Sequence, residues 1–339
     1  MQNQITEKQK LLNEKGRLAN PGFAFHPLFE YSRNEIAASV WRIKEWDYYA
    51  TLNNDYGFSC TIADLGYSYL VGAVFLDFNQ KSYQKKTKIG WFSFGKLNMP
   101  STSEKGDVHY TKDGYDFHFI RKDNERLIEC RIDAFDGNKP LYAKLEIRDM
   151  KDETMVIATP WNENLKAFYY NQKINCMPTN GRVSIGDKTV HFQEDTAFTV
   201  LDWGRGVWTY KNTWYWGSAS GVVDGKRFGF NIGYGFGNTA KATENMLFYD
   251  GKAHKLDQVE FHIDPTDYMK PWVFTSPDHR FELTMEPLID RQDTTNFLII
   301  KNLGHQVFGR FKGYVVLDDG TKLIIDQLTG FAEQITNHY

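Results

Sequence analysis

Cysteine is scarce in this chain of 339 residues, and the three that occur lie far apart, at Cys60, Cys130 and Cys176. They form no C-x-x-C pair, so we expect neither a disulfide framework nor a cysteine-ligated zinc site. Such usage is typical of a reducing compartment. Residues 1–16 are polar and charged, unlike a secretory signal. The sequence therefore predicts a cytoplasmic protein.

Long apolar runs and an excess of one charge are also missing. The longest apolar stretch, from about Leu70 to Leu76, is far too short to cross a bilayer. The formal net charge is only −3, which indicates no dominant basic surface. We expect no membrane span, and neither nucleic acid nor an anionic membrane as the partner.

Several catalytic and cofactor motifs are absent. The sequence has no G-x-G-x-x-G opening a helix, no G-x-x-x-x-G-K-[ST] loop and no G-x-S-x-G elbow. Its nine histidines are scattered, without H-E-x-x-H or H-x-H spacing. The sequence therefore predicts no metal and no cofactor.

What the sequence has in quantity is strand pattern. Aromatic residues make up 16% of the chain, and they suit pleated, half-buried surfaces. From about residue 37 onward nearly every segment resembles a strand, and Asp-Gly or Gly-Asp pairs separate several of them. These pairs are Asp136-Gly137, Gly186-Asp187, Asp224-Gly225, Asp250-Gly251 and Asp319-Gly320.

Recurrent hairpins predict an all-β protein with two lipocalin-like antiparallel β-barrels in tandem. Residues 2–15 are expected to form a short helix that ends at Gly16. The polar stretch 162–173 is the expected break between halves of comparable size. The predicted division is therefore an N-terminal helix or arm at 1–20, a first barrel at 21–170 and a second at 171–339.

The stretch from 202 to 250 carries the strongest functional signal. Four of the nine tryptophans fall within it: Trp203, Trp208, Trp214 and Trp216. Residues 228–237 then alternate strictly between bulky residues and glycine or asparagine, which predicts a strand with one nearly bare face. Since glycine weakens a strand, something must pack closely on that face, either another backbone or a ligand.

Charged and polar residues lie among these rings. Asp202 and Arg205 flank Trp203, and they are either a structural ion pair at a strand end or a polar pair at a pocket mouth. Glu244 and Asn245 follow the bare-faced strand, where Glu244 is either a solvated loop residue or a group that closes over a cavity. Tyr210, Trp214 and Trp216 either line a ligand cavity or fill a core.

The chain resembles a bacterial family catalogued as domain of unknown function 2804. The segments that carry the likeness are GRLANPGFAFHPLFEY, KEWDYYATLN and the tryptophan block with the strand that follows it. More distantly, it is similar to the hydroxyneurosporene synthase and AttH-like group, whose members have two lipocalin-like barrels. That group includes hydratases with a D-H-x-W-G element, but Leu201 stands here where the histidine is expected.

Two main classes of function follow, an enzyme and a carrier. The enzyme would be of the hydratase or isomerase type and would act on an isoprenoid or lipid-like molecule. Its candidate catalytic residues are Asp202, Tyr234 and Glu244. The ligand-binding candidates are Trp203, Arg205, Tyr210, Trp214, Trp216, Asn231 and Asn245. The alternative is a non-catalytic carrier of a hydrophobic ligand. A carbohydrate-active protein is a third possibility, which would need exposed tryptophans.

Overall fold

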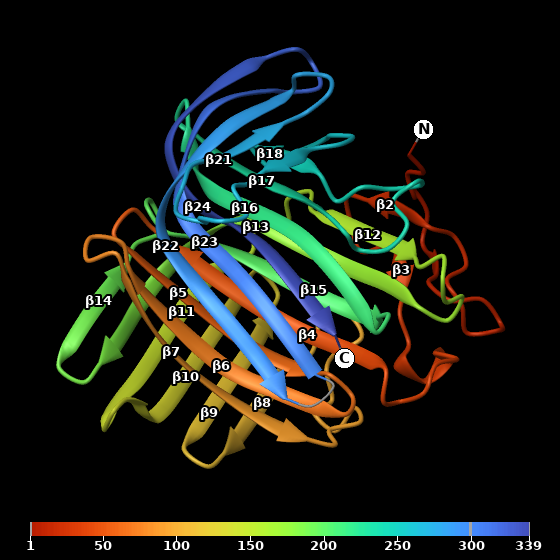
Figure 1. Cartoon of the computed structure of the whole chain (residues 1–339), viewed down its shortest axis with the longest axis horizontal. Helices are drawn as coiled ribbons and strands as arrows, with labels where there is room; N and C mark the ends of the chain where they lie inside the picture. The colour runs from red at the N-terminus through yellow and green to blue at the C-terminus, as the bar shows by residue number, and fades with distance from the viewer. Residues whose placement is uncertain (1, 298–299, 339) are drawn as a thin grey trace.

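The computed structural model describes residues 2–297 and 300–338, and these form two large, curled antiparallel sheets in tandem (Figure 1). The predicted all-β, lipocalin-like architecture is confirmed. The one helical element among the described residues is a single 3₁₀ turn, η1 (Arg33–Glu35).

The first sheet contains thirteen strands, ordered β7-β6-β5-β4-β15-β13-β11-β10-β9-β8, with β12, β2 and β14 attached to this path. Their bounds are β2 (Gly22–Ala24), β4 (Ile43–Leu52), β5 (Tyr56–Asp64), β6 (Ser68–Asp77), β7 (Ser82–Trp91), β8 (Val108–Lys112), β9 (Tyr115–Lys122), β10 (Glu125–Asp136), β11 (Lys139–Arg148), β12 (Met155–Pro160), β13 (Phe168–Ile185), β14 (Lys188–Phe192) and β15 (Phe198–Val207).

The second sheet contains nine strands, ordered β19-β18-β17-β16-β24-β23-β22-β21-β20. Their bounds are β16 (Lys211–Val223), β17 (Lys226–Tyr234), β18 (Met246–Tyr249), β19 (Lys252–Lys255), β20 (Glu260–His262), β21 (Trp272–Thr275), β22 (Phe281–Phe297), β23 (Ile300–Val316) and β24 (Lys322–His338). A two-stranded parallel sheet pairs β1 (Gln9–Lys10) with β3 (Phe29–Glu30).

The two large sheets share one plan. In each sheet, four consecutive strands form a meander, β4 to β7 or β16 to β19. The first strand of this meander also pairs with the last strand of the same sheet, so β4 pairs with β15 and β16 pairs with β24. The second sheet thus repeats the topology of the first, although no sequence repeat is evident between the halves.

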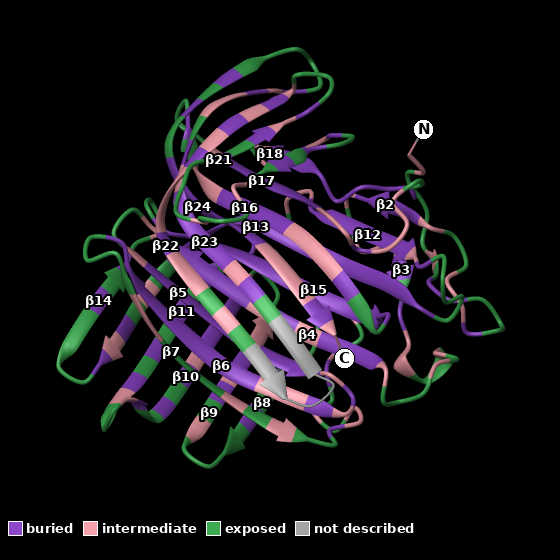
Figure 2. Ribbon diagram, in the orientation of Figure 1, coloured by how far each residue is buried: buried purple, intermediate pink, exposed green. Residues whose placement is uncertain are grey.

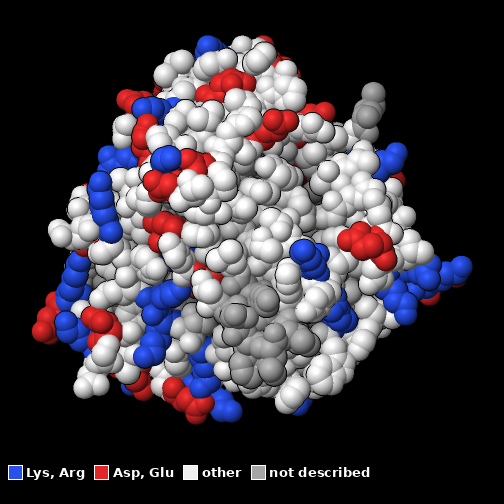
Figure 3. Space-filling model, in the orientation of Figure 1, with Lys and Arg blue, Asp and Glu red and all other residues white. Residues whose placement is uncertain are grey.

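Three strands in the middle of the first sheet are buried on both faces. Every residue of β15 is buried, as are the first twelve of β13 and most of β4 (Figure 2). One face of these strands packs inside the first curled sheet, and the other face packs against β16, β17 and β24. The second face is where polar side chains from both sheets meet. On the outside, acidic and basic side chains both occur over the face of the molecule that Figure 3 shows.

The Asp-Gly and Gly-Asp turn predictions are confirmed. Each pair connects two antiparallel neighbours, for example β16 to β17 through Asp224 and Gly225. Both residues of that turn have positive φ, 50° and 74°, which is the conformation that this two-residue hairpin requires.

The predicted N-terminal helix over 2–15 is wrong. The segment is an extended arm that places Ile5, Leu11 and Leu12 in the core, and Asn3 and Ile5 exchange backbone hydrogen bonds with Phe23. Gly16 does not cap a helix. It has φ +63° in a tight turn, where a Cβ would lie 2.4 Å from the carbonyl oxygen of Glu35.

The glycine-faced strand is confirmed as β17, but it ends earlier than the alternation predicts. Phe228, Phe230 and Ile232 fill the inner curl of the second sheet. Gly235, at φ +95°, ends the strand. Phe236 therefore turns to the opposite side and stacks on Tyr169, with ring centroids 4.7 Å apart.

The chain passes from one sheet to the other at residues 208–210, between β15 and β16. Residue 170, where the sequence places the boundary, lies inside β13. The end of the polar stretch that suggested a break there, residues 168–173, is the buried start of β13, and its Lys173 contacts Trp216 of the second sheet. The division of the chain into domains stays a prediction.

Candidate functional site

Glu244 lies at the centre of the polar region between the sheets. It belongs to the irregular segment 235–245 that connects β17 to β18, and it is 1% exposed. The hydroxyl of Tyr169 donates to its Oε2 over 3.2 Å. Its Oε1 is buried and has no hydrogen-bond partner among the described residues. A buried carboxylate oxygen without a donor strongly favours the protonated form.

The surroundings of Glu244 change its acidity accordingly. Burial raises the pKa of its carboxyl to about 7, the ammonium of Lys173 opposes this rise, and the charge of Asp202 adds to it. A carboxyl group with this pKa exchanges its proton near neutrality.

Lys173 and Asp202 form an ion pair on neighbouring strands. They are direct partners in the register of β13 and β15, and Lys173 Nζ lies 2.9 Å from Asp202 Oδ2. Asn171 Nδ2 donates to Asp202 Oδ1 over 2.6 Å. The pair is buried, so each charge depends on the other for its stability.

Trp216 connects this ion pair to the second sheet. Lys173 Nζ lies 3.7 Å from the centroid of the Trp216 ring, a cation–π contact. The indole Nε1 donates to Asn231 Oδ1 over 2.7 Å, and Asn231 Nδ2 donates to the backbone oxygen of Glu244 over 2.8 Å. The chain of contacts thus runs from Asp202 to the segment that carries Glu244.

A second buried carboxyl, Glu333 on β24, lies close to the same lysine. Trp214 Nε1 donates to its Oε1 over 2.8 Å, and Gln306 Nε2 donates to its Oε2 over 3.0 Å. Burial raises the pKa of Glu333 to about 7, while the Trp214 hydrogen bond, Arg291 and Lys173 oppose the rise. The site therefore holds two carboxyl groups that titrate near neutrality beside one ammonium.

The structure brings five of the predicted residues together: Asp202, Glu244, Trp214, Trp216 and Asn231. Glu244 is not a solvated loop residue, and it closes against Gly233 instead. A sixth, Asn245, supports the segment: its Oδ1 accepts from the Gly233 amide over 2.7 Å.

Trp203 and Arg205 lie elsewhere. They are on the opposite face of β15 from Asp202, because strand residues an odd number apart point to opposite sides. Arg205 is fully buried, 3.0 Å from Asp47, and its guanidinium stacks 4.0 Å from the Trp203 ring centroid. The predicted Asp202–Arg205 pair, whether structural or at a pocket mouth, is therefore wrong.

Tyr234 and Tyr210 also lie away from Glu244. Tyr234 is on the face of β17 opposite Asn231 and stacks on Tyr215, with centroids 4.6 Å apart. Burial raises its pKa to about 12, so it holds its proton at neutral pH. Tyr210 is 47% exposed, in the connection between the sheets.

Sequence reasoning missed Lys173, Asn171, Tyr169 and Glu333. The first three are alternate residues of β13, and their spacing of two is a strand signal. It was hidden because residues 162–173 read as a polar break. Glu333 lies on the last strand, and no local pattern connects it to residues far earlier in the chain.

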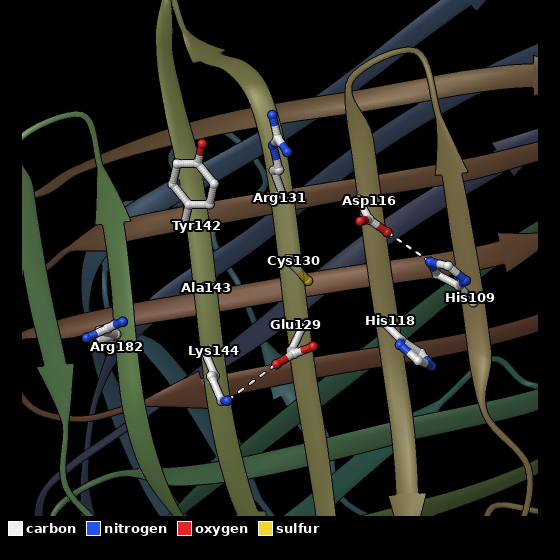
Figure 4. A pocket seen from close by; sticks show the side chains of 10 residues that line it. All are labelled: His109, Asp116, His118, Glu129, Cys130, Arg131, Tyr142, Ala143, Lys144 and Arg182. Atoms are coloured by element: carbon white, nitrogen blue, oxygen red, sulfur yellow. Dashed lines mark hydrogen bonds and ion pairs between the residues drawn. The ribbon is translucent and has the colours of Figure 1, made fainter.

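A second place of interest is a shallow groove of about 430 Å³ on the solvent face of β8–β11 and β13 (Figure 4). His109 and His118 lie side by side there, and His109 Nε2 is 2.9 Å from Asp116 Oδ1. Lys144 pairs with Glu129 across 3.5 Å. Its charges are largely matched and solvated, so it offers weaker recognition than the buried site.

Two further findings concern metal ions and membranes. Within residues 2–297 and 300–338, no group of three or more histidine, cysteine or acidic side chains is arranged to hold a metal ion. The same residues include no helix of the length and apolar character needed to span a membrane.

The fold and the site together define an all-β protein of two lipocalin-like sheets with a buried acidic and aromatic site between them. Residues 2–339 match the family model of the domain of unknown function 2804. The chain belongs to this family. No curated protein sequence shows significant similarity to it.

Solved structures share the architecture. CghA has a TM-score of 0.51 at 9% identity, with 98% of this chain and 97% of that chain covered. A putative AttH from Nitrosomonas europaea has a TM-score of 0.51 at 15% identity, covering 90% and 95%. Kievitone hydratase from Nectria haematococca has a TM-score of 0.49 at 8% identity, covering 87% and 88%. At these identities the likeness concerns the fold alone.

Proposed function

We propose that this protein is an enzyme of the hydratase or isomerase type that acts on a hydrophobic small molecule between the two sheets. Glu244 carries the proposal: it is buried, one of its oxygens has no donor among the described residues, and its pKa is about 7. Such a group gives and takes protons at neutral pH, as a general acid–base catalyst must.

The chemistry is a proton transfer at carbon. In an isomerisation, the Glu244 carboxylate takes a proton from one carbon, the electron pair shifts along the double bond, and the proton returns to another carbon. In a hydration, the Glu244 carboxyl protonates one carbon of the double bond and a water oxygen bonds to the other. The water's proton then goes to a second carboxylate, for which Glu333 is the candidate.

The neighbouring groups favour a conjugated, largely apolar substrate. Tyr169 contacts the carboxyl and stacks on Phe236, and the Trp216 ring lies against the Lys173 ammonium. Lys173 is a fixed positive charge, which suits an oxygen that gains negative charge as a conjugated carbonyl reacts. Asp202 holds that ammonium in place.

Access requires movement. Glu244 is 1% exposed, and a cavity lined by Ala50, Val200 and Ser218, among others, has a volume of only about 10 Å³. That volume holds about one water molecule. Since Glu244 lies on a connecting segment and not on a strand, we propose that displacement of residues 235–245 admits the substrate.

The non-catalytic carrier is the alternative. A carrier has no need of acid–base groups and predicts that Asp202 and Glu244 face solvent, whereas they are 8% and 1% exposed. A carbohydrate platform needs exposed tryptophans, whereas Trp203, Trp208 and Trp216 are buried. Burial of these residues supports the enzyme over both alternatives.

Isotope incorporation tests the proposal without knowledge of the substrate. Wild-type protein is incubated with a small-molecule extract of its own host in D₂O, and in parallel in H₂¹⁸O, followed by mass spectrometry. An isomerase places deuterium at a carbon position that does not exchange. A hydratase adds both deuterium and ¹⁸O.

Two variants give the test its specificity. Glu244→Gln removes the acid but preserves shape, and it should abolish the labelled product. Glu129→Gln changes a carboxyl in the outer groove and should leave the labelling unchanged. An apolar molecule that co-purifies with wild-type protein but never gains isotope would favour the carrier and contradict the enzyme.

A further inference from the structure

Three aromatic rings form an exposed cluster at the rim of the first sheet, where β4 begins and β7 ends. Trp41 and Phe92 are 49% and 56% exposed, and Phe94 is half-buried and contacts both rings. The Trp41 centroid is 4.7 Å from that of Phe94 and 5.9 Å from that of Phe92. We call these three residues the rim cluster. Exposed apolar groups that gather in one place mark interaction sites more often than scattered ones do.

The backbone holds two of these rings outward at a cost. Phe92 and Phe94 have φ values of +61° and +49°, a left-handed conformation that is strained for residues with a side chain. Ser93, between them, points inward and is buried. Strain of this kind persists only where the surrounding structure enforces it.

Asp64 supplies that enforcement. Its carboxylate is fully buried and accepts from Ser93 Oγ over 2.8 Å, from the Gly95 amide over 2.8 Å and from the Gly66 amide over 3.0 Å. These bonds anchor the loop on both sides of Phe94. The rings are thus displayed on a rigid loop, not left exposed by a loose one.

Basic residues outnumber acidic ones in the segments that form the rim cluster. Residues 36–44, 64–73 and 85–103 contain six basic residues and one acidic residue, Asp64, in a chain whose net charge is −3. Asp64 is buried beneath the loop, and Lys44 is buried in β4. Lys86 and Lys96 are exposed, whereas Lys85 and Lys88 pair with Asp293 and Asp113. The even overall charge conceals this local excess, so the net value is a poor guide to an anionic partner.

We propose that the rim cluster docks the protein on an anionic lipid surface, with its rings in the headgroup region. Tryptophan and phenylalanine favour that region, and nearby basic side chains add attraction to anionic lipids. A stable protein interface buries about 800 Å² on each partner and involves about 20–30 residues a side. Three rings are too few for that but suffice for a shallow, reversible membrane contact.

Vesicle co-sedimentation tests the proposal on the full chain. The vesicles contain phosphatidylcholine alone or with phosphatidylglycerol, and binding is expected only to the anionic ones. The double variant Trp41→Ala, Phe92→Ala should lose binding by at least about tenfold, since each buried ring contributes at least about 1.5 kcal/mol. Lys96→Gln should weaken it about fivefold, and about 0.5 M salt should do the same or more.

The control variant is Ile324→Ala, which removes an exposed apolar residue of the second sheet (63% exposed) and should bind as wild type does. Near-ultraviolet circular dichroism verifies that the variants are folded. Absence of wild-type binding to anionic vesicles, or equal binding by the double variant, overturns the proposal. So does self-association in sedimentation velocity that the double variant abolishes, because the rim cluster would then be a protein interface.

Discussion

The carboxylate of Glu244 occupies the space that a side chain on Gly233 would need. A Cβ on Gly233 would lie 2.2 Å from Glu244 Oε1 and 2.6 Å from the backbone oxygen of Tyr215. The bare face of β17 therefore exists, at this position, to admit an acidic group from the following segment. Gly233 and the Glu244 carboxyl are thus sterically complementary, although eleven positions separate the two residues in the sequence.

Gly233→Ala should consequently destabilise the protein by about 1–3 kcal/mol, the usual cost of overpacking a closed interior. Gly217→Ala is the matched control on the neighbouring strand, since its Cβ would meet side-chain atoms of Ile232 at 3.1 Å, which can shift. It should cost less than about 1 kcal/mol. Urea unfolding measures both free energies, and equal values would contradict the role of Gly233.

Stability should fall as pH rises from about 4.5 to about 7. Glu244 and Glu333 each have a folded-state pKa raised to about 7, so the folded state binds more protons than the unfolded state in this window, and deprotonation favours unfolding. The loss is on the order of 3 kcal/mol for each group at most. Unfolding free energies at pH 5 and pH 8 measure it.

Glu244→Gln tests the assignment of that pH dependence. The amide cannot ionise, so this variant should lose less stability than wild type between pH 5 and pH 8. Glu129→Gln, whose parent carboxyl is 45% exposed, should follow the wild-type profile. A Glu244→Gln profile parallel to that of wild type would show that another group titrates.

Removal of the Lys173 ammonium should raise the pKa of both buried carboxyls further, because its positive charge lowers each of them. Lys173→Met also leaves Asp202 buried without its cation, which costs about 3–5 kcal/mol. Infrared titration of the carboxyl bands follows the pKa values. Lys226→Met, at an exposed pair with Asp250, should move neither band. If the carboxyl bands titrate in Lys173→Met as they do in wild type, the lysine does not influence the pKa values of the two carboxyl groups.

The sequence predicts some parts of this molecule much better than others. Hairpin turns and the alternation of β17 are local sequence patterns. The turn at Asp224-Gly225 and the position of Gly233 on the bare face of a strand could therefore be predicted from adjacent residues alone. The Asp202–Arg205 error was avoidable too, because an odd spacing on a strand separates two side chains. The electrostatic interaction of Lys173 with Glu333 was not predictable, since the two residues approach each other only where the two curled sheets pack together.

Arg205 illustrates a buried charge whose role is structural. Its guanidinium donates to the backbone oxygens of Trp46 and Gly204 over 2.8 Å each, and to Asp47. Arg205→Met would leave the Asp47 carboxylate in the interior without its cation and should destabilise the fold by about 3–5 kcal/mol. Lys226→Ala, at an exposed pair with Asp250, should leave the stability close to that of wild type. Thermal unfolding distinguishes them, and a mild effect for Arg205→Met would contradict this structural role.

The N-terminal arm should control how readily the segment around Glu244 opens. Gln2 Oε1 accepts from the Thr243 amide over 2.8 Å, and the Asn3 amide donates to the Lys241 oxygen over 2.7 Å. From the other side, Lys255 Nζ donates to Thr243 Oγ1 and to the Asn245 oxygen, both over 2.8 Å. Hydrogen bonds at Lys241, Thr243 and Asn245 thus hold the chain on both sides of Glu244.

Gln2→Ala removes both hydrogen bonds from Thr243, together with those to Leu256 and Asp257. It should speed hydrogen exchange at residues 240–245 by at least about fivefold, since each hydrogen bond contributes about 1 kcal/mol to the closed state. Gln9→Ala changes the same arm at a side chain whose Oε1 accepts from Asn20 Nδ2 over 3.3 Å, and it should leave exchange at 240–245 unchanged. Exchange in β4 and β15 should be unaffected by either variant. If Gln2→Ala speeds exchange throughout both sheets, the arm stabilises the whole fold and does not act as a local latch on Glu244.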